Sequence, residues 1–265
     1  MYLNITGGVD VGVVQIIFSP TGGTQKVADI IASEWGIPVK KIDLSNAKTD
    51  FSAASLNKED VAVIAVPSFG GRIPALAAQR LGKIHGNQAL CVLVCVYGNR
   101  AYEDTLVELN DVAVQSGFKV IAGIAAVAEH SIIHQYAAGR PDGQDKAELQ
   151  GFAKKILAKI NGNPSDLSAP QIPGNRPYKK AGGAGLVPKA DHNCTSCGRC
   201  AESCPAQAIG KKTPKETDSK KCISCMRCVS ICPQSARNVN SAMVAVAAMA
   251  IKKACADRKN NTLFC

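Results

Sequence analysis

The chain has 265 residues and a mass of 27.7 kDa, and its 46% apolar and 20% charged content excludes an intrinsically disordered protein. The net charge is +10. Residues 1–160 hold 15 basic and 15 acidic side chains, so the whole excess lies in residues 161–265, together with ten of the twelve cysteines. The longest apolar run, residues 241–251, is too short for a membrane-spanning helix of ~20 residues. The first residues lack the basic start of a secretion signal, and we expect a cytoplasmic protein.

Residues 1–160 alternate between strand-like and helix-like segments, which predicts an α/β fold with a doubly wound parallel sheet. Apolar runs rich in β-branched residues, typical of buried parallel strands, occupy residues 13–18, 61–67, 90–97 and 120–127, and a weaker run at residues 39–44 is expected at the sheet edge. Apolar residues at helical spacing predict helices near residues 27–35, 76–84, 106–113 and 149–160. Five such strands fit the order 2-1-3-4-5.

A loop rich in hydroxyl groups and glycine follows the first predicted strand and opens a helix. Its sequence is Ser19-Pro20-Thr21-Gly22-Gly23-Thr24. Backbone N–H groups and the helix dipole favour an anion at such a place, although a plain helix cap is the alternative. The loop has neither the Gly-Lys-Ser/Thr of nucleotide hydrolases nor the G-x-G-x-x-G of dinucleotide-binding proteins. It contains no cation, so we expect neutral donors to hold a phosphate there.

Two further segments follow the third and fourth predicted strands, at the sheet edge where ligands of such folds bind. These segments, residues 67–74 and 97–104, each combine aromatic residues with glycine, which suits stacking on a flat ring. The ligand-binding candidates in them are Pro67, Ser68, Phe69, Gly70, Gly71, Tyr97, Gly98, Asn99, Arg100 and Tyr102. Phe69, Tyr97 and Tyr102 are the stacking candidates, and the sequence does not rank them.

These motifs resemble those of flavodoxin over roughly residues 10–160. Its Ser/Thr-x-Thr-Gly-x-Thr phosphate loop is matched at Ser19, Thr21, Gly22 and Thr24. The resemblance implies that FMN places its phosphate on residues 19–24 and its isoalloxazine between residues 67–72 and 97–102. Arg100 beside the ring would then favour reduced, anionic flavin. His130 and His134 lack an evident third metal ligand, and we expect structural or flavin-rim histidines.

Residues 161–190 separate this region from a cysteine module. Ten of these thirty residues are glycine or proline and no apolar periodicity survives, which predicts a linker. The module at residues 191–240 contains C-x2-C-x2-C-x3-C-P twice, with every cysteine offset from its counterpart by 28 residues. Residues 241–265 are predicted to form a C-terminal docking helix.

The cysteine spacing predicts two [4Fe-4S] clusters in which the fourth cysteine of each motif crosses to the other cluster. One cluster would use Cys194, Cys197, Cys200 and Cys232, and the other Cys222, Cys225, Cys228 and Cys204. Zinc needs no third cysteine at this spacing, and a disulfide framework needs an oxidising compartment. The module resembles a small α+β bacterial-type ferredoxin with two clusters. The whole layout, including the Gly-Gly-Arg-Ile-Pro run at residues 70–74, resembles flavodoxin–ferredoxin fusion proteins of anaerobes.

The resemblance implies an electron-transfer protein that passes electrons between FMN, two clusters and an external partner, either a redox protein or a small molecule. The alternative is an FMN-dependent reductase of a small-molecule substrate, so whether the chain is an enzyme stays open, as does a homodimer. Nucleic-acid binding is not expected, because no recognition motif accompanies the basic residues. The basic excess instead offsets the anionic clusters, and the remainder would steer an acidic redox partner.

Overall fold

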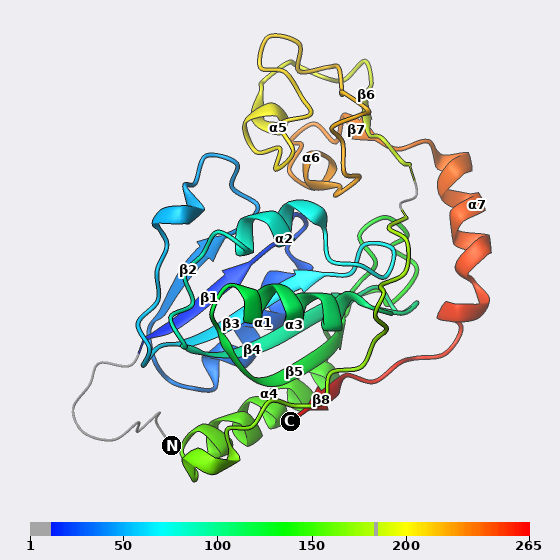
Figure 1. Cartoon of the computed structure of the whole chain (residues 1–265). Coiled ribbons are helices and arrows are strands. Elements are labelled where there is room, and N and C mark those ends of the chain that lie inside the picture. Colours follow the sequence, from blue (N-terminus) through cyan, green and yellow to red (C-terminus); the bar gives the residue numbers. More distant parts are fainter. Residues whose placement is uncertain (1–11, 183–184) are drawn as a thin grey trace.

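The computed structural model describes residues 12–182 and 185–265. The first residues, on which the expectation of no secretion signal rests, lie outside these ranges. Figure 1 shows one large sheet domain with the cysteine module stacked above one end of its strands. Among the described residues, every helix is too short or too polar to cross a bilayer.

The large sheet confirms the predicted parallel arrangement. Its parallel strands are β1 (Val13–Ile17), β2 (Val39–Asp43), β3 (Val61–Pro67), β4 (Leu90–Tyr97) and β5 (Lys119–Val127), in the order β2-β1-β3-β4-β5. β2 lies at the edge and is largely exposed, as its weaker apolar pattern indicates, whereas β1, β3 and β4 are buried nearly throughout. This order is that of the flavodoxin-like doubly wound fold.

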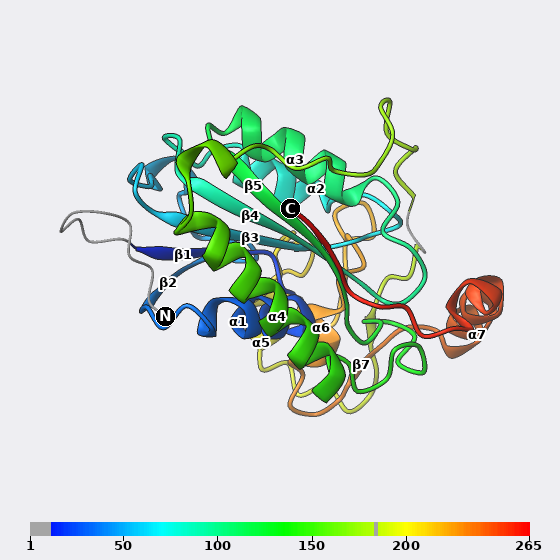
Figure 2. The same cartoon turned by 90° about the horizontal axis from the view of Figure 1, so that it is seen from below.

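Helices cover both faces of the sheet and create two apolar cores (Figure 2). The helices are α1 (Gly23–Ser33), α2 (Ala75–Leu81), α3 (Thr105–Gln115) and α4 (Gly143–Ile160), with short 3-10 turns at Phe51–Ala53, Pro164–Asp166 and Lys253–Cys255. α1 and α4 enclose one core, in which the fully buried Trp35 donates its indole N–H to the carbonyl of Ala153 at 3.1 Å. α2 and α3 enclose the other core, around Leu81, Leu106 and Leu109.

The C-terminal segment differs from the predicted single helix over residues 241–265. α7 (Ser241–Ile251) ends well before that, and β8 (Thr262–Phe264) returns to pair antiparallel with β5. The sheet therefore has six strands and the order β2-β1-β3-β4-β5-β8. Asn261 fixes this return, because its side chain accepts the N–H of Val127 at 2.9 Å and donates to Asp145 at 3.0 Å. The cysteine module is thus inserted between two elements of one sheet domain.

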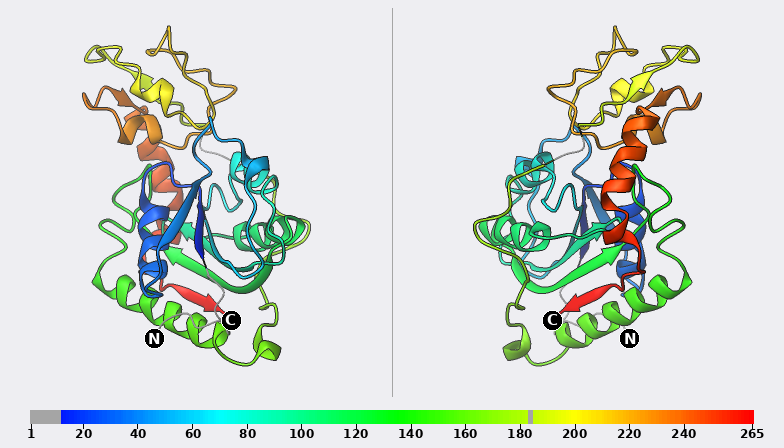
Figure 3. Two further views of the ribbon diagram at one scale, coloured as in Figure 1. Left: turned by 90° about the vertical axis from the view of Figure 1, so that its left-hand side faces the viewer. Right: turned by 90° about the vertical axis from the view of Figure 1, so that its right-hand side faces the viewer.

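The cysteine module repeats its backbone as well as its sequence. It contains a two-stranded ribbon, β6 (Lys189–Ala190) with β7 (Arg237–Asn238), and two single-turn helices, α5 (Arg199–Glu202) and α6 (Arg227–Ser230). Positive φ angles recur at equivalent positions of the two motifs, at Ser196 and Ser224, Gly198 and Met226, and Gln207 and Ser235. Figure 3 shows this module above the sheet domain, with α7 standing along the flank.

The linker follows the sheet domain closely over its described part. The carboxylate of Asp104 accepts the backbone N–H groups of Asn175 and Lys179 at 2.8 and 2.7 Å. Asp111 on α3 accepts from the guanidinium of Arg176 at 2.5 and 2.8 Å. Polar side chains near α3 therefore hold this Gly/Pro-rich segment in place, although it contains almost no regular secondary structure.

Candidate functional site

A cavity of about 460 Å³ lies at the carboxyl ends of the central strands, within the size range of small-molecule sites. We call it the loop cavity. The loops after β1, β3, β4 and β5 line it, and the linker, the cysteine module and α7 close it from the other sides. Its lining includes ten of the predicted ligand-binding residues: Thr21, Gly23, Thr24, Pro67, Ser68, Phe69, Gly70, Tyr97, Gly98 and Arg100.

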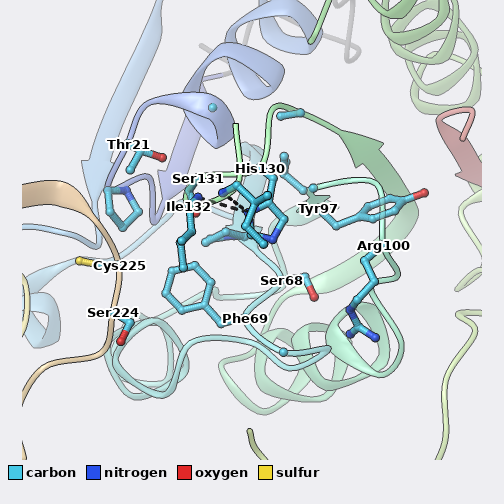
Figure 4. Close-up of a pocket in the computed structure, with 18 of the residues that line it drawn as sticks. Thr21, Ser68, Phe69, Tyr97, Arg100, His130, Ser131, Ile132, Ser224 and Cys225 are labelled. Atoms are coloured by element: carbon cyan, nitrogen blue, oxygen red, sulfur yellow. Dashed lines mark hydrogen bonds between the residues drawn. The ribbon is translucent and has the colours of Figure 1, made fainter. Parts of the chain in front are cut away.

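Five predicted residues lie outside this lining, namely Ser19, Gly22, Gly71, Asn99 and Tyr102. Asn99 holds the C-terminal segment instead, because its amide donates to the carbonyls of Cys255 and Asp257 at 3.1 and 2.9 Å. Tyr102 packs on Tyr97, with ring centroids 5.3 Å apart. Of the three stacking candidates, Phe69 and Tyr97 therefore line the loop cavity, and Tyr102 does not (Figure 4).

The hydroxyl-rich loop presents backbone donors at the start of α1. Gly22 takes a left-handed conformation with φ of 92° and turns the chain into the helix. The hydroxyl of Ser19 accepts the N–H of Gln25 at 2.9 Å. Within the described residues, the N–H groups of Gly23 and Thr24 have no partner, as is usual for the first turn of a helix. They offer two neutral donors to an anion in the loop cavity.

A cation reaches this loop from a part of the chain 208 residues away. The guanidinium of Arg227, on α6 of the cysteine module, lies 3.5 Å from the carbonyl oxygen of Ser19. The sequence indicated neutral donors alone, because Arg227 is distant in sequence and only the docking of the module brings it here. The start of α1 is therefore more positive than its own residues imply.

The charge of Arg100 is compensated within the cavity wall. Its guanidinium binds the carboxylate of Glu103 at 2.7 and 3.2 Å, and Lys179 from the linker binds the same carboxylate at 2.6 Å. The hydrogen bond from Arg100 lowers the pKa of Glu103, so this acid is ionised at neutral pH. This carboxylate offsets the positive charge by which Arg100 was expected to favour reduced, anionic flavin.

The loop after β5 contributes residues 128–133 to the lining, whereas the sequence indicated only that His130 and His134 were structural or flavin-rim histidines. His130 accepts the N–H groups of Ile132 and Ile133 on Nδ1, at 3.2 Å each, which assigns its proton to Nε2. Burial lowers the pKa of His130, so the ring is a neutral N–H donor. Gly98 makes room for this ring, because an added Cβ would lie 2.6 Å from it. The position of the loop at the carboxyl end of a parallel strand is the signal that could have identified it.

The cysteine module forms one wall of the loop cavity. Ile223, Ser224 and Cys225 line it together with the loops of the sheet domain. Figure 4 shows Ser224 and Cys225 on the side where Thr21 lies, while Tyr97 and Arg100 lie at the other side. One predicted cluster ligand and the predicted phosphate loop therefore share a single cavity.

Two smaller cavities inside the module bring the cysteines together in crossed sets. The outer cysteine cavity is lined by Cys194, Cys197, Cys200 and Cys232, and the inner cysteine cavity by Cys204, Cys222, Cys225 and Cys228. Each set combines three cysteines of one motif with the fourth of the other, as the spacing predicts. The sulfurs surround a space, and no group of three Cys, His, Asp or Glu side chains in the described ranges converges on a single-ion position.

Residues 193–237 match the family of 4Fe-4S dicluster domains. No curated protein matches the chain. Among solved structures, the chain is similar to a flavodoxin of Streptococcus pneumonia TIGR4, with a TM-score of 0.39, 20% identity, and coverage of 56% of this chain and 98% of that one. The chain is also similar to a flavodoxin from the domain Archaea, with a TM-score of 0.41, 12% identity, and coverage of 58% of this chain and 100% of that one. For an NADH:FMN oxidoreductase in its apo form, the TM-score is 0.43, the identity is 13%, and the coverage is 60% of this chain and 95% of that one. The assignment as flavodoxin-like rests on the strand order itself.

Proposed function

We propose that this chain, a flavodoxin-like sheet domain carrying a 4Fe-4S dicluster domain, binds one FMN and two [4Fe-4S] clusters and transfers electrons between them and an external redox partner. In this proposal residues 1–160 form the FMN domain and residues 191–240 the cluster domain. Residues 161–190 are the linker, and residues 241–265 return to the FMN domain. FMN exchanges one or two electrons and each cluster exchanges one, so the chain would convert between the two modes.

The residues of the loop cavity fit FMN. The free N–H groups at the start of α1 and the hydroxyl of Thr21 suit a phosphate, and Arg227 adds a cation near this loop. Phe69 offers an aromatic face, and Gly70 and Gly98 line the same cavity, where they leave room for the backbone of Gly182 and the ring of His130. His130 contributes a neutral N–H donor. The cavity volume of about 460 Å³ suits one ligand of this size.

The crossed cysteine cavities fit two four-iron clusters, because each set offers four thiols around one space. Each fourth cysteine is also prepared as a ligand. The sulfur of Cys204 accepts the N–H of Ala208, and the sulfur of Cys232 accepts the N–H of Ala236, both at 3.3 Å. Such N–H donors stabilise a thiolate.

One observation carries the proposed order of the cofactors: Cys225 lines both the inner cysteine cavity and the loop cavity. A cluster in the inner cavity would therefore lie next to a flavin in the loop cavity. A cluster in the outer cavity would lie farther from the flavin, where Cys197 is exposed to solvent. We infer the order FMN, inner cluster, outer cluster and external partner.

The test begins with anaerobic purification and quantitation of iron, sulfide and FMN. We expect about eight irons and one FMN for each chain. Cys225→Ser should abolish rapid electron exchange between flavin and cluster after photoreduction, as measured by absorbance. Cys197→Ser is the matched control, because it changes the outer cluster only and should leave that exchange in place. Equal rates in both variants would contradict the order, and protein without flavin or iron would contradict the function.

The alternative of a small-molecule reductase needs an accessible flavin face. Ile223 of the cluster domain and Ala247 and Ile251 of α7 line the loop cavity together with the loops of the sheet domain. This arrangement favours electron transfer to the cluster domain over binding of a second ligand. Turnover of a quinone or a disulfide faster than by free FMN would support the alternative.

A further inference from the structure

A buried arginine breaks the internal symmetry of the cluster domain. Each motif continues five residues beyond its fourth cysteine to a buried position, which is Ile209 in the first motif and Arg237 in the second. Ile209 is 5% exposed and packs in the apolar core of the module. Arg237 is 1% exposed and is among the largest fully buried side chains of the described structure. Placing a guanidinium where the repeat has isoleucine is costly unless its charge is compensated.

The protein partners of Arg237 are all neutral. Its guanidinium donates to the hydroxyl of Thr217 at 2.7 Å and to the carbonyls of Pro188, at 3.3 Å, and Pro214. Its Nε is buried and has no hydrogen-bond partner. Within residues 12–182 and 185–265, no carboxylate pairs with it, whereas the other buried arginine, Arg140, forms a two-point pair with Asp145. The counter-charge of Arg237 must therefore be something other than a carboxylate.

The guanidinium lies between the two cysteine cavities. Arg237 and its partner Pro214 line the outer cysteine cavity. Its other partners, Pro188 and Thr217, line the inner cysteine cavity. A four-iron cluster with four thiolates is an anion, and its sulfurs accept hydrogen bonds. Two such anions on either side would supply both the missing charge and an acceptor for the free Nε–H.

We propose that Arg237 is the shared counter-charge of the two clusters and raises the reduction potentials of both. This inference rests on the proposed binding of two clusters. Reduction adds one negative charge to a cluster, and a fixed cation in a dry environment stabilises that extra charge. Arg237 is a positioning residue in this role, because it also ties together the three loops that carry Pro188, Pro214 and Thr217.

The test is a redox titration of the holoprotein followed by electron paramagnetic resonance. Arg237→Ile installs the residue of the first motif, and Arg237→Lys keeps the charge. Arg199→Gln is the matched control, because Arg199 lines the outer cysteine cavity but is exposed to solvent. We expect Arg237→Ile to make reduction of both clusters at least tenfold less favourable, which is a shift of 59 mV for a one-electron couple. Arg237→Lys and Arg199→Gln should each shift the equilibrium by less than that.

The outcomes separate the inference from the proposed function. Wild-type protein without two clusters would refute the proposed function, whatever the variants do. Normal iron content with unchanged potentials in Arg237→Ile would overturn the counter-charge. If Arg237→Ile cannot retain its clusters, Arg237→Lys decides. Retained clusters with near-native potentials in Arg237→Lys would support the role of the charge. Loss of the clusters in Arg237→Lys as well would mean that Arg237 acts only through its hydrogen bonds to the three loops, and the proposal would be wrong.

Discussion

Asp104 anchors the linker through hydrogen bonds to its carboxylate. Replacing Asp104 with alanine tests whether the position of the cluster domain depends on this anchor. Its carboxylate is 1% exposed and accepts two backbone N–H groups and the side-chain amide of Asn175, the last at 3.0 Å. The linker then continues to Lys179, Gly182 and Leu186, which line the loop cavity. Loss of this anchor should loosen the path between the two domains.

The magnitude follows from the two backbone donors. A hydrogen bond to a charged acceptor contributes about 1.5–3 kcal/mol, and a buried donor left unpaired costs about 1–3 kcal/mol. With two such donors, we expect Asp104→Ala to destabilise attachment of the linker by about 3 kcal/mol. The loss is no larger, because water reaches both N–H groups once the linker detaches. Asp104→Asn keeps one oxygen acceptor and should cost about 1 kcal/mol. Asp29→Asn is the control, since the exposed ion pair of Asp29 with Lys41 is worth at most about 1 kcal/mol.

The assay combines hydrogen exchange of the linker amides with flavin-to-cluster transfer kinetics. Asp104→Ala should speed exchange of the amides of Asn175 and Lys179 by about a hundredfold, which corresponds to about 3 kcal/mol. Transfer between flavin and inner cluster should slow in the same variant and stay unchanged in Asp29→Asn. Unchanged linker exchange in Asp104→Ala would refute the reasoning, because the carboxylate would then not be what holds the segment.

The hold of Asp104 also depends on pH. The N–H of Lys179, followed by that of Asn175, lowers the pKa of Asp104 from its usual value of 3.8. A lowered pKa means that folding favours the ionised form, so this stabilisation is fully present above about pH 4. It is lost as the pH falls through the lowered pKa. The protection factors of the linker amides, which correct for the slower intrinsic exchange at low pH, should therefore fall at acid pH in the wild type and much less in Asp104→Ala.

Two further predictions test the site. Cys204→Ser should remove the inner cluster and Cys232→Ser the outer one, and each variant should lose about four irons. Only Cys204→Ser should stop electron exchange between the inner cluster and the flavin. The reverse pattern would disprove the crossed ligation. His130→Ala leaves the N–H groups of Ile132 and Ile133 without their acceptor, so FMN binding should weaken about tenfold, or about 1.4 kcal/mol, in a fluorescence titration. Unaltered affinity would show that this ring does not order the loop.

The central sheet was predictable from sequence because its strands are buried on both faces. Continuous apolar runs such as residues 61–67 and 90–97 have no other stable place in the fold, and both match the observed strands to the residue. The crossed cysteine sets were predictable because the spacing of three thiols on one loop allows them to share one cluster, while the fourth must come from elsewhere. These features depend on local pattern alone.

The rest depends on contacts between distant segments. β8 has only three residues, and its strand character comes from pairing with β5 and from Asn261 rather than from its own pattern. Cys225 reaches the loop cavity, and Arg227 reaches the loop before α1, because the cluster domain docks there, and no local periodicity of the sequence indicates this contact. The loop after β5 was within reach of sequence reasoning, since it follows the carboxyl end of a parallel strand, but only His130 and His134 were considered there, as structural or flavin-rim residues.

The order of elements along the chain has a consequence for how the protein assembles. β8 is synthesised after the cluster domain, yet it completes the sheet that begins with β1 and covers the free edge of β5. The edge of β5 therefore stays open until the whole inserted domain has been made and has brought residues 262–264 back to it. Compaction of the cluster domain shortens the loop that this pairing must close. Delivery of iron and sulfide would thus favour pairing of β8 with β5, although the sheet itself contains no cluster ligand. In a cell short of iron, chains with an exposed β5 edge would accumulate.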